Sequence, residues 1–97
     1  MIVGTIRLPA NQLDRARPSM ASIIEASRAE AGCVEYSYAE DVLDRGLIHI
    51  KERWKDREAL DEHFKTAHLA AWRAAWPSLG LGERNLRLYE LGDAQAV

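Results

Sequence analysis

Four stretches of the chain alternate between apolar and polar residues, the period-two pattern that is typical of half-buried β-strands. The four stretches are residues 2–8, 33–40, 47–54 and 85–91. Pro9 ends the first of them, because proline cannot donate to a sheet ladder. The turn residues Asp44-Arg45-Gly46 stand between the second and third stretches and predict a β-hairpin.

Apolar residues between the first two strands recur at the three-to-four spacing of an amphipathic helix. The pattern runs from Asn11, a good capping residue, to Ala31, and Gly32 follows as a stop signal. Pro18 lies inside this pattern and removes one backbone hydrogen bond. We therefore expect a kink at Pro18, or a short first turn followed by the main helix.

A second helical region follows the third strand. Asp56 is placed to cap a helix, and Thr66 is placed to cap a second helix after a break. The inner face of the first helix is predicted to hold Leu60, His63, Phe64 and Ala67, and that of the second Leu69, Trp72 and Trp76. Pro77, Gly80 and Gly82 are expected to end the region.

The order strand, helix, strand, strand, helix, strand is the split βαβ arrangement of a ferredoxin-like α+β sandwich. It predicts one domain over residues 1–92, in which helices cover one face of a four-stranded antiparallel sheet, and a tail over residues 93–97. The opposite face of the sheet carries no helices and would be exposed in a single chain. Pairing with the same face of a second copy would give a two-fold homodimer, a dimeric α/β barrel that buries on the order of 2,000 Å².

Composition narrows the range of partners. Of the 97 residues, 47% are hydrophobic and 29% charged, which is typical of a globular domain. The net charge is -2 with both signs interleaved, so the sequence offers no basic stripe for nucleic acid or anionic lipid. A single cysteine, Cys33, excludes an internal disulfide and favours a reducing cytoplasm. No apolar run approaches the roughly 20 residues of a membrane span, and the first residues lack the features of a signal peptide.

Candidate chemistry gathers in residues 52–72, which hold two of the three histidines and two of the three tryptophans. Glu52 shares a strand face with Ile50 and Trp54, so its carboxyl group points among apolar side chains. It is either a base or orienting group whose pKa is raised by an apolar pocket, or a buried acceptor for backbone groups or for a nearby arginine such as Arg53 or Arg73, and the second is the commoner case for buried charges. The Trp54 ring can line a cavity and donate its N–H, or it can simply pack in the core.

His63 and His68 are the candidate bases. They are five residues apart, so they do not share one face of a continuous helix, which argues against a metal pair. If the helix breaks at Thr66, however, both rings can converge on one cavity, where a neutral imidazole is a suitable base for a phenolic or enolic proton. The structural alternatives are a core histidine bonded to a carbonyl for His63 and a role in pinning the break for His68.

The remaining candidates are aromatic. Tyr36 and Tyr38 share a strand face with Val34, and either hydroxyl can reach a cavity. Phe64 and Trp72 are candidates to line the same cavity, although the four-residue spacing of Trp72 and Trp76 also fits an ordinary core stripe.

Several of these features together resemble the antibiotic biosynthesis monooxygenase (ABM) domain family. They are Gly32-Cys33, Tyr36, Glu52-x-Trp54, Leu60, His63 and His68. The resemblance covers nearly the whole chain and implies a dimeric barrel of two ferredoxin-like subunits, each with an apolar cavity between sheet and helices. Members of the family include cofactor-free oxygenases of anthrone- or quinol-type substrates, haem-degrading enzymes and proteins that act on signalling molecules.

The leading hypothesis is a cofactor-independent monooxygenase that uses O2 to oxidise a small aromatic quinol or anthrone-like substrate. The base would be His63 or His68. The substrate-binding residues would be Trp54, Glu52, Tyr36, Phe64 and Trp72, and no metal or other cofactor would take part, since the sequence holds no flavin, haem or metal motif. The alternatives are a non-catalytic dimeric module that binds a small hydrophobic ligand, and an isomerase or lyase of a small signalling molecule.

Two branches of the family fit less well. Haem-degrading members place an asparagine near the end of the first strand, where this chain has Thr5-Ile6-Arg7. Anthrone-oxidising members are expected to have a polar amide on the strand just before the tryptophan, where this chain has Ile48 and Ile50. Haem degradation and a polyketide substrate are therefore both unsupported by the sequence.

Overall fold

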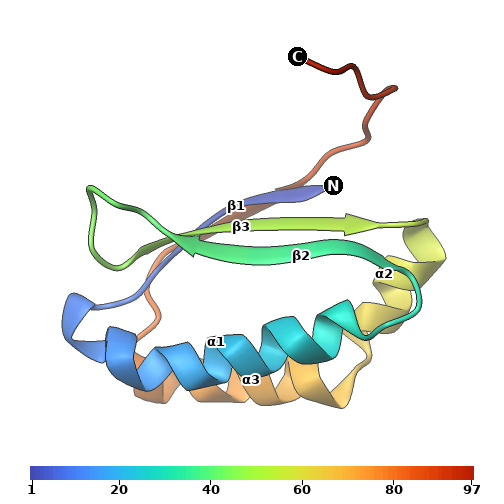
Figure 1. The fold of residues 1–97 in the computed structure, drawn as a ribbon. Helices are drawn as coiled ribbons and strands as arrows, with labels where there is room; N and C mark the ends of the chain where they lie inside the picture. The colour runs from blue at the N-terminus through green and yellow to red at the C-terminus, as the bar shows by residue number, and fades with distance from the viewer.

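The strands and helices follow each other in the predicted order in the computed structural model, which describes residues 1–97. They are β1 (Ile2–Arg7), a 3-10 turn η1 (Ala10–Gln12), α1 (Leu13–Arg28), β2 (Cys33–Glu40), β3 (Leu47–Trp54), α2 (Arg57–Phe64), α3 (Ala67–Leu79) and β4 (Arg84–Leu88). Figure 1 shows all three helices on one side of the sheet, and the chain after β4 leaving on the other side. None of the helices is both long and apolar enough to cross a membrane.

The sheet is antiparallel throughout, with the strand order β2-β3-β1-β4, which confirms the predicted ferredoxin-like α+β fold. Its register aligns Tyr36, Glu52, Ile2 and Leu88 in one row across all four strands. The neighbouring row contains Gly4 between Ile50 and Leu86. Gly4 contributes no side chain there, and a Cβ atom at this position would lie 1.9 Å from the Asn85 carbonyl oxygen.

The core lies between the helix-covered face of the sheet and two of the helices. Its sheet side is built on Ile6, Ile48 and Ile50, and its helix side on Leu13, Ala16, Ile23, Leu69, Trp72 and Leu79. Full burial of such side chains is worth about 1.5–3 kcal/mol each. This burial holds the helices against the sheet and fixes which strand residues face them.

The first helix differs from its prediction at both ends. Asn11 lies within the 3-10 turn, and the residue that precedes α1, Gln12, makes no side-chain cap hydrogen bond, so the predicted Asn11 cap is wrong. The helix ends at Arg28 rather than at Ala31. Pro18 lies inside α1 without interrupting it, and the separate short turn comes before α1, six residues ahead of the proline.

A bulge near the start of β2 overturns the predicted facing of Val34. Cys33 pairs with Trp54 and Glu35 pairs with Arg53, so two steps along β2 match one step along β3. Val34 is the extra residue and is 56% exposed instead of sharing the buried face with Tyr36. A bulge shifts the alternation by one residue, which is why the simple period-two pattern placed Val34 on the wrong face.

The break between α2 and α3 is present as predicted. Asp56 caps α2 by accepting the Ala59 N–H (2.8 Å). The Thr66 hydroxyl donates to the His63 carbonyl (2.7 Å) and accepts the Leu69 N–H (3.4 Å), so this one side chain ends one helix and begins the next.

Three details of this helical region differ from the predictions. Pro77 lies inside the last turn of α3 and does not end it, whereas the predicted stop at Gly80 is confirmed, since Gly80 caps the helix in the left-handed conformation (φ 70°). Phe64 and Ala67, predicted on the inner face, are both exposed. They flank the break, where the chain changes direction and the helical spacing no longer predicts which residues face inward.

Candidate functional site

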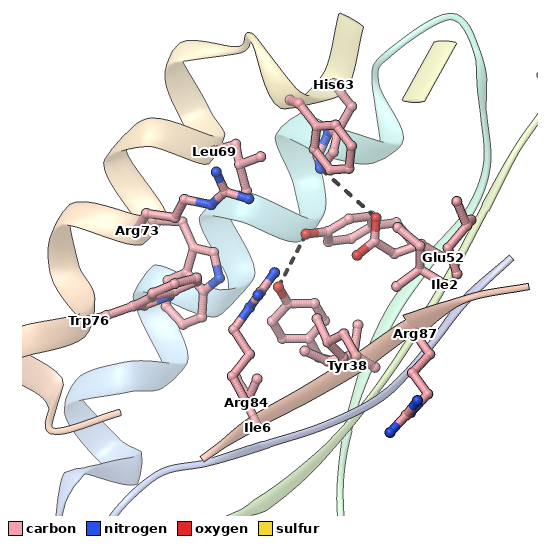
Figure 2. Close-up of a pocket in the computed structure, with 16 residues that line it drawn as sticks. Ile2, Ile6, Tyr38, Glu52, His63, Leu69, Arg73, Trp76, Arg84 and Arg87 are labelled. Atoms are coloured by element: carbon pink, nitrogen blue, oxygen red, sulfur yellow. Dashed lines mark hydrogen bonds and ion pairs between the residues drawn. The ribbon is translucent and has the colours of Figure 1, made fainter. Parts of the chain in front are cut away.

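A cavity of about 190 Å³ lies between the sheet and the helices, and most of the residues that line it are hydrophobic. Its polar lining groups are the hydroxyls of Tyr36 and Tyr38, the Glu52 carboxyl, the His63 imidazole and the guanidinium groups of Arg73 and Arg84. Figure 2 shows the side chains of the sheet and of α3 on opposite sides of this space, and shows Arg87 pointing away from it. An apolar pocket with a few converging polar groups is the usual form of a small-molecule site.

The two tyrosines form a pair inside the cavity. Their hydroxyl oxygens are 3.1 Å apart, and their rings stack with centroids 5.5 Å apart. Burial raises the pKa of Tyr38 to about 12 and raises the pKa of Tyr36 still further from its usual value. Both hydroxyls therefore keep their protons at neutral pH and remain hydrogen-bond donors.

Glu52 lies beside this pair and is only 6% exposed. Its Oε1 accepts the Trp54 indole N–H (3.2 Å) and lies 3.9 Å from Nε2 of His63. Burial raises the pKa of the Glu52 carboxyl, and this effect outweighs the opposing hydrogen bond from Trp54. The predicted pairing with Arg53 or Arg73 is wrong, because neither guanidinium makes an ion pair with Glu52.

His63 is 1% exposed and is held by a residue outside the predicted site. Glu30, in the turn after α1, places one carboxylate oxygen, Oε2, 2.7 Å from Nδ1 of His63 and 2.8 Å from Nε2 of His68. A carboxylate only accepts hydrogen bonds, so each of these imidazole nitrogens must carry a proton. We accordingly assign neutral His63 the tautomer with a proton on Nδ1 and a free lone pair on Nε2, on the side of Glu52 and the cavity.

The geometry separates the two histidines. His63 lines the cavity, and its ring centroid is 4.5 Å from that of Trp54. His68 is absent from the cavity lining and reaches the site only through Glu30. The helix break brings the two rings to a centroid distance of 6.1 Å, but only the His63 ring lines the cavity, so the predicted convergence of both rings on one cavity is not seen.

Residues 1–75 match the model of the antibiotic biosynthesis monooxygenase family, which is most of the chain. The chain belongs to this family. A solved structure from Deinococcus radiodurans, provisionally assigned to the same family, superposes with a TM-score of 0.91 at 26% identity and covers 100% of this chain and 98% of the other.

Two further relatives extend the comparison. Rv0793 of Mycobacterium tuberculosis, a provisionally assigned monooxygenase, is 36% identical over 63 residues, and its structure superposes with a TM-score of 0.82, covering 97% of this chain and 96% of the other. The Synechocystis protein sll1783, which is uncharacterised, is 27% identical over 97 residues, all of this chain. The chain spans 66% of sll1783 and 61% of the Rv0793 sequence, so the alignments leave about a third or more of these relatives unmatched.

Most of the residues predicted for the ABM site meet at the cavity. Its lining includes Tyr36, Glu52, His63, Phe64 and Trp72. Trp54 contacts both Glu52 and His63 but does not itself line the cavity.

Sequence reasoning missed Glu30 and the role of the arginines. Glu30 follows a helix in an ordinary turn and is 33 residues from His63, and nothing in the local sequence distinguishes it from other surface acids. Arg84 is the first residue of β4, one residue before the predicted start of this strand at residue 85, and its pairing with Ile6 places it on the cavity side of the sheet.

Glu30, His63 and His68 are also the three groups that could hold a metal ion, since their candidate ligand atoms lie within 4.8 Å of one another. A metal bound there would have to replace the two imidazole protons that now bond to Oε2 of Glu30, because a ligating nitrogen needs a free lone pair. The hydrogen-bonded arrangement already satisfies all three groups.

Glu52→Gln is expected to flatten the pH dependence of stability. Because the pKa of Glu52 is higher in the folded protein than its usual 4.5, the folded state binds this proton more tightly than the unfolded state does. That contribution is complete below pH 4.5 and is lost as the pH rises through the folded-state pKa. The variant should therefore gain free energy of unfolding relative to wild type as the pH rises from about 5 to about 8.

Urea unfolding across this range measures the effect. Glu62→Gln removes the same charge at an exposed position and serves as the control. Parallel curves for wild type and Glu52→Gln would contradict the raised pKa.

Proposed function

We propose that this ABM-family protein is a cofactor-independent monooxygenase that oxidises a small aromatic quinol with O2, with His63 as the general base. The observation that carries the proposal is the contact between Nδ1 of the buried His63 imidazole and Glu30 (2.7 Å), at the wall of an apolar cavity. The tautomer assigned from this contact leaves Nε2 of His63 free to accept a proton. The family and the monooxygenase assignments of its members support the same reaction class.

The Glu30–His63 pair supplies the base. A carboxylate on Nδ1 holds the ring in the tautomer whose Nε2 can take a proton, and it stabilises the imidazolium that forms, as in acid–histidine pairs of other enzymes. His68 donates to the same oxygen and thereby fixes Glu30. The proposal therefore assigns proton transfer to His63 and a positioning role to His68 and Glu30.

The oxygen chemistry balances with the quinol as the only reductant. Removal of a phenolic proton by His63 gives an electron-rich anion that can pass electrons to O2. One oxygen atom forms a new C–O bond on the ring, the other leaves as water, and the four electrons and both protons come from the quinol, which ends as a hydroxyquinone. One hydroxyl of the Tyr36–Tyr38 pair donates to the other, so the pair keeps one O–H that can donate a hydrogen bond to the reduced oxygen.

The size of the cavity favours a single aromatic ring. A dry protein cavity of about 150 Å³ accepts benzene, and the cavity of this protein measures about 190 Å³. A one-ring quinol fits that volume, whereas a three-ring anthrone requires the walls to move. Phe64, Leu69 and Trp72 would pack against the ring, and Trp54 would act indirectly by holding Glu52.

Oxygen uptake with a panel of one-ring quinols tests the assignment of the base. His63→Ala is expected to lower kcat/KM by about 10²-fold or more, the usual value of a general base. His68→Ala and Glu30→Gln should lower kcat/KM by a smaller factor, because both variants keep Nε2 of His63. Both should also shift the pH profile of the rate. His49→Ala, on the opposite sheet face, is the matched control.

Full activity in His63→Ala would contradict the assignment. No uptake above the uncatalysed rate with any quinol would favour a binding module, or an isomerase that a product analysis under anaerobic conditions would detect.

We also propose that the protein forms a homodimer through the sheet face that the helices leave bare. Val3 and Thr5 lie on this face of the central strand β1 and are half-buried. The charged residues around them are partly neutralised by the pairs Lys51–Glu35 (3.0 Å) and His49–Asp41 (2.8 Å). A second copy stacked on this face would cover it without leaving these charges unpaired.

Light scattering at micromolar concentration should give twice the mass of one chain. Val3→Glu places a charge in the middle of the proposed interface and should yield the monomer with an unchanged circular dichroism spectrum. A wild-type monomer would contradict the dimer.

A further inference from the structure

Two arginines at the cavity have no partner within the protein. Arg73 on α3 and Arg84 on β4 both line the cavity and both approach the ring of Trp76, with guanidinium carbons 6.0 Å and 5.3 Å from its centroid. Figure 2 places both guanidinium groups on the Trp76 side of the cavity, with that of Arg84 next to Tyr38. The cation–π contacts hold these charges near one spot without neutralising them.

Three of the other arginines pair with acids elsewhere in the fold. Arg7 pairs with Asp44, Arg17 with Glu40 and Arg57 with Asp61. Arg73 and Arg84 make no ion pair and no hydrogen bond, and the only acid that lines the cavity is Glu52, whose Oε1 already accepts from Trp54. The buried indole N–H of Trp76 also lacks an acceptor. The two exposed guanidinium groups and the buried indole N–H of Trp76 are thus three donors beside the cavity that make no hydrogen bond within the protein.

We infer that the cavity selects a one-ring phenolic substrate that carries an oxyanion, a carboxylate or a phosphate, which pairs with Arg84 and Arg73. Guanidinium groups match the planar geometry of these anions and bind them through two parallel hydrogen bonds. The anion would lie at the Trp76 side of the cavity and the phenolic hydroxyl at the His63 and Tyr36 side. This inference names the substrate class of the proposed function and rests on the cavity being its substrate site.

The placement also gives the arginines a role in orientation. A ring held by its oxyanion at one end and by hydroxyl donors at the other has only one productive direction in the cavity. The phenolic proton then faces Nε2 of His63 rather than the apolar wall formed by Leu69 and Trp72. Holding the reacting groups in this way is a direct contribution to rate.

Binding of three matched phenols tests the inference without requiring turnover. The probes are 4-hydroxybenzoate, its neutral amide 4-hydroxybenzamide, and 4-hydroxyphenyl phosphate, followed by quenching of tryptophan fluorescence and by calorimetry. The carboxylate or the phosphate should bind at least about tenfold more tightly than the amide, the difference expected for a charge-assisted hydrogen bond. Whichever anion binds more tightly identifies the head group.

Arginine variants show which side chains cause the preference for anions over the amide. Arg84→Met should reduce the ratio of anion affinity to amide affinity to nearly one, and Arg73→Met should reduce this ratio in part. Arg45→Met, an exposed and unpaired arginine in the β2–β3 turn, is the control and should leave the ratio unchanged. Equal binding of acid and amide, no binding of either anion at millimolar concentration, or an equal loss in Arg45→Met would overturn the inference.

The binding assay also separates this inference from the proposed reaction. His63→Gln should keep the anion preference even though it loses turnover. A preference that persists without oxygen uptake would refute the monooxygenase and leave the anion site standing. Oxygenation of neutral quinols with no anion preference would refute the anion site alone.

Discussion

The site depends on one oxygen atom, Oε2 of Glu30, which accepts hydrogen bonds from both His63 and His68. An imidazole that is 1% exposed needs a partner for its N–H, because an unpaired buried donor costs about 1–3 kcal/mol. Glu30 supplies that partner from the turn between α1 and β2 and ties this turn to both α2 and α3. The same contact fixes the tautomer of His63 and so decides which nitrogen faces the cavity.

Local features of the chain make this contact possible. Thr66 ends α2 and starts α3, and without that break a five-residue spacing would point the two imidazoles to different faces of one helix. The bulge at Val34 sets the register of β2 so that Tyr36 faces inward, in one row with Glu52. In the next row Gly4 leaves the place between Ile50 and Leu86 without a side chain. The cavity therefore has a polar end at Tyr36, Glu52 and His63 and a cationic end at the arginines around Trp76.

Much of this could be read from the sequence, because it is encoded locally. Alternation and capping residues predicted the four strands, the hairpin and the helix break at Thr66, and the facing of Glu52 among apolar residues follows from strand period alone. The features that the sequence did not predict depend on contacts between residues distant in sequence, or on competition between two local structures. Glu30 meets its partners across 33 and 38 residues, which no local pattern reports. Asn11 looked like a helix cap, but a 3-10 turn occupies its position.

The most direct test of this account is the protonation state of each nitrogen of His63, measured by ¹⁵N–¹H correlation NMR of the imidazole at a pH where the ring is neutral. The account predicts a proton on Nδ1, with the chemical shift of a strong hydrogen bond, and an unprotonated Nε2. Loss of that signal pattern in Glu30→Gln would identify Glu30 as its cause. A neutral His63 with its proton on Nε2 would contradict the account, because the lone pair would then face Glu30 and no base would face the cavity.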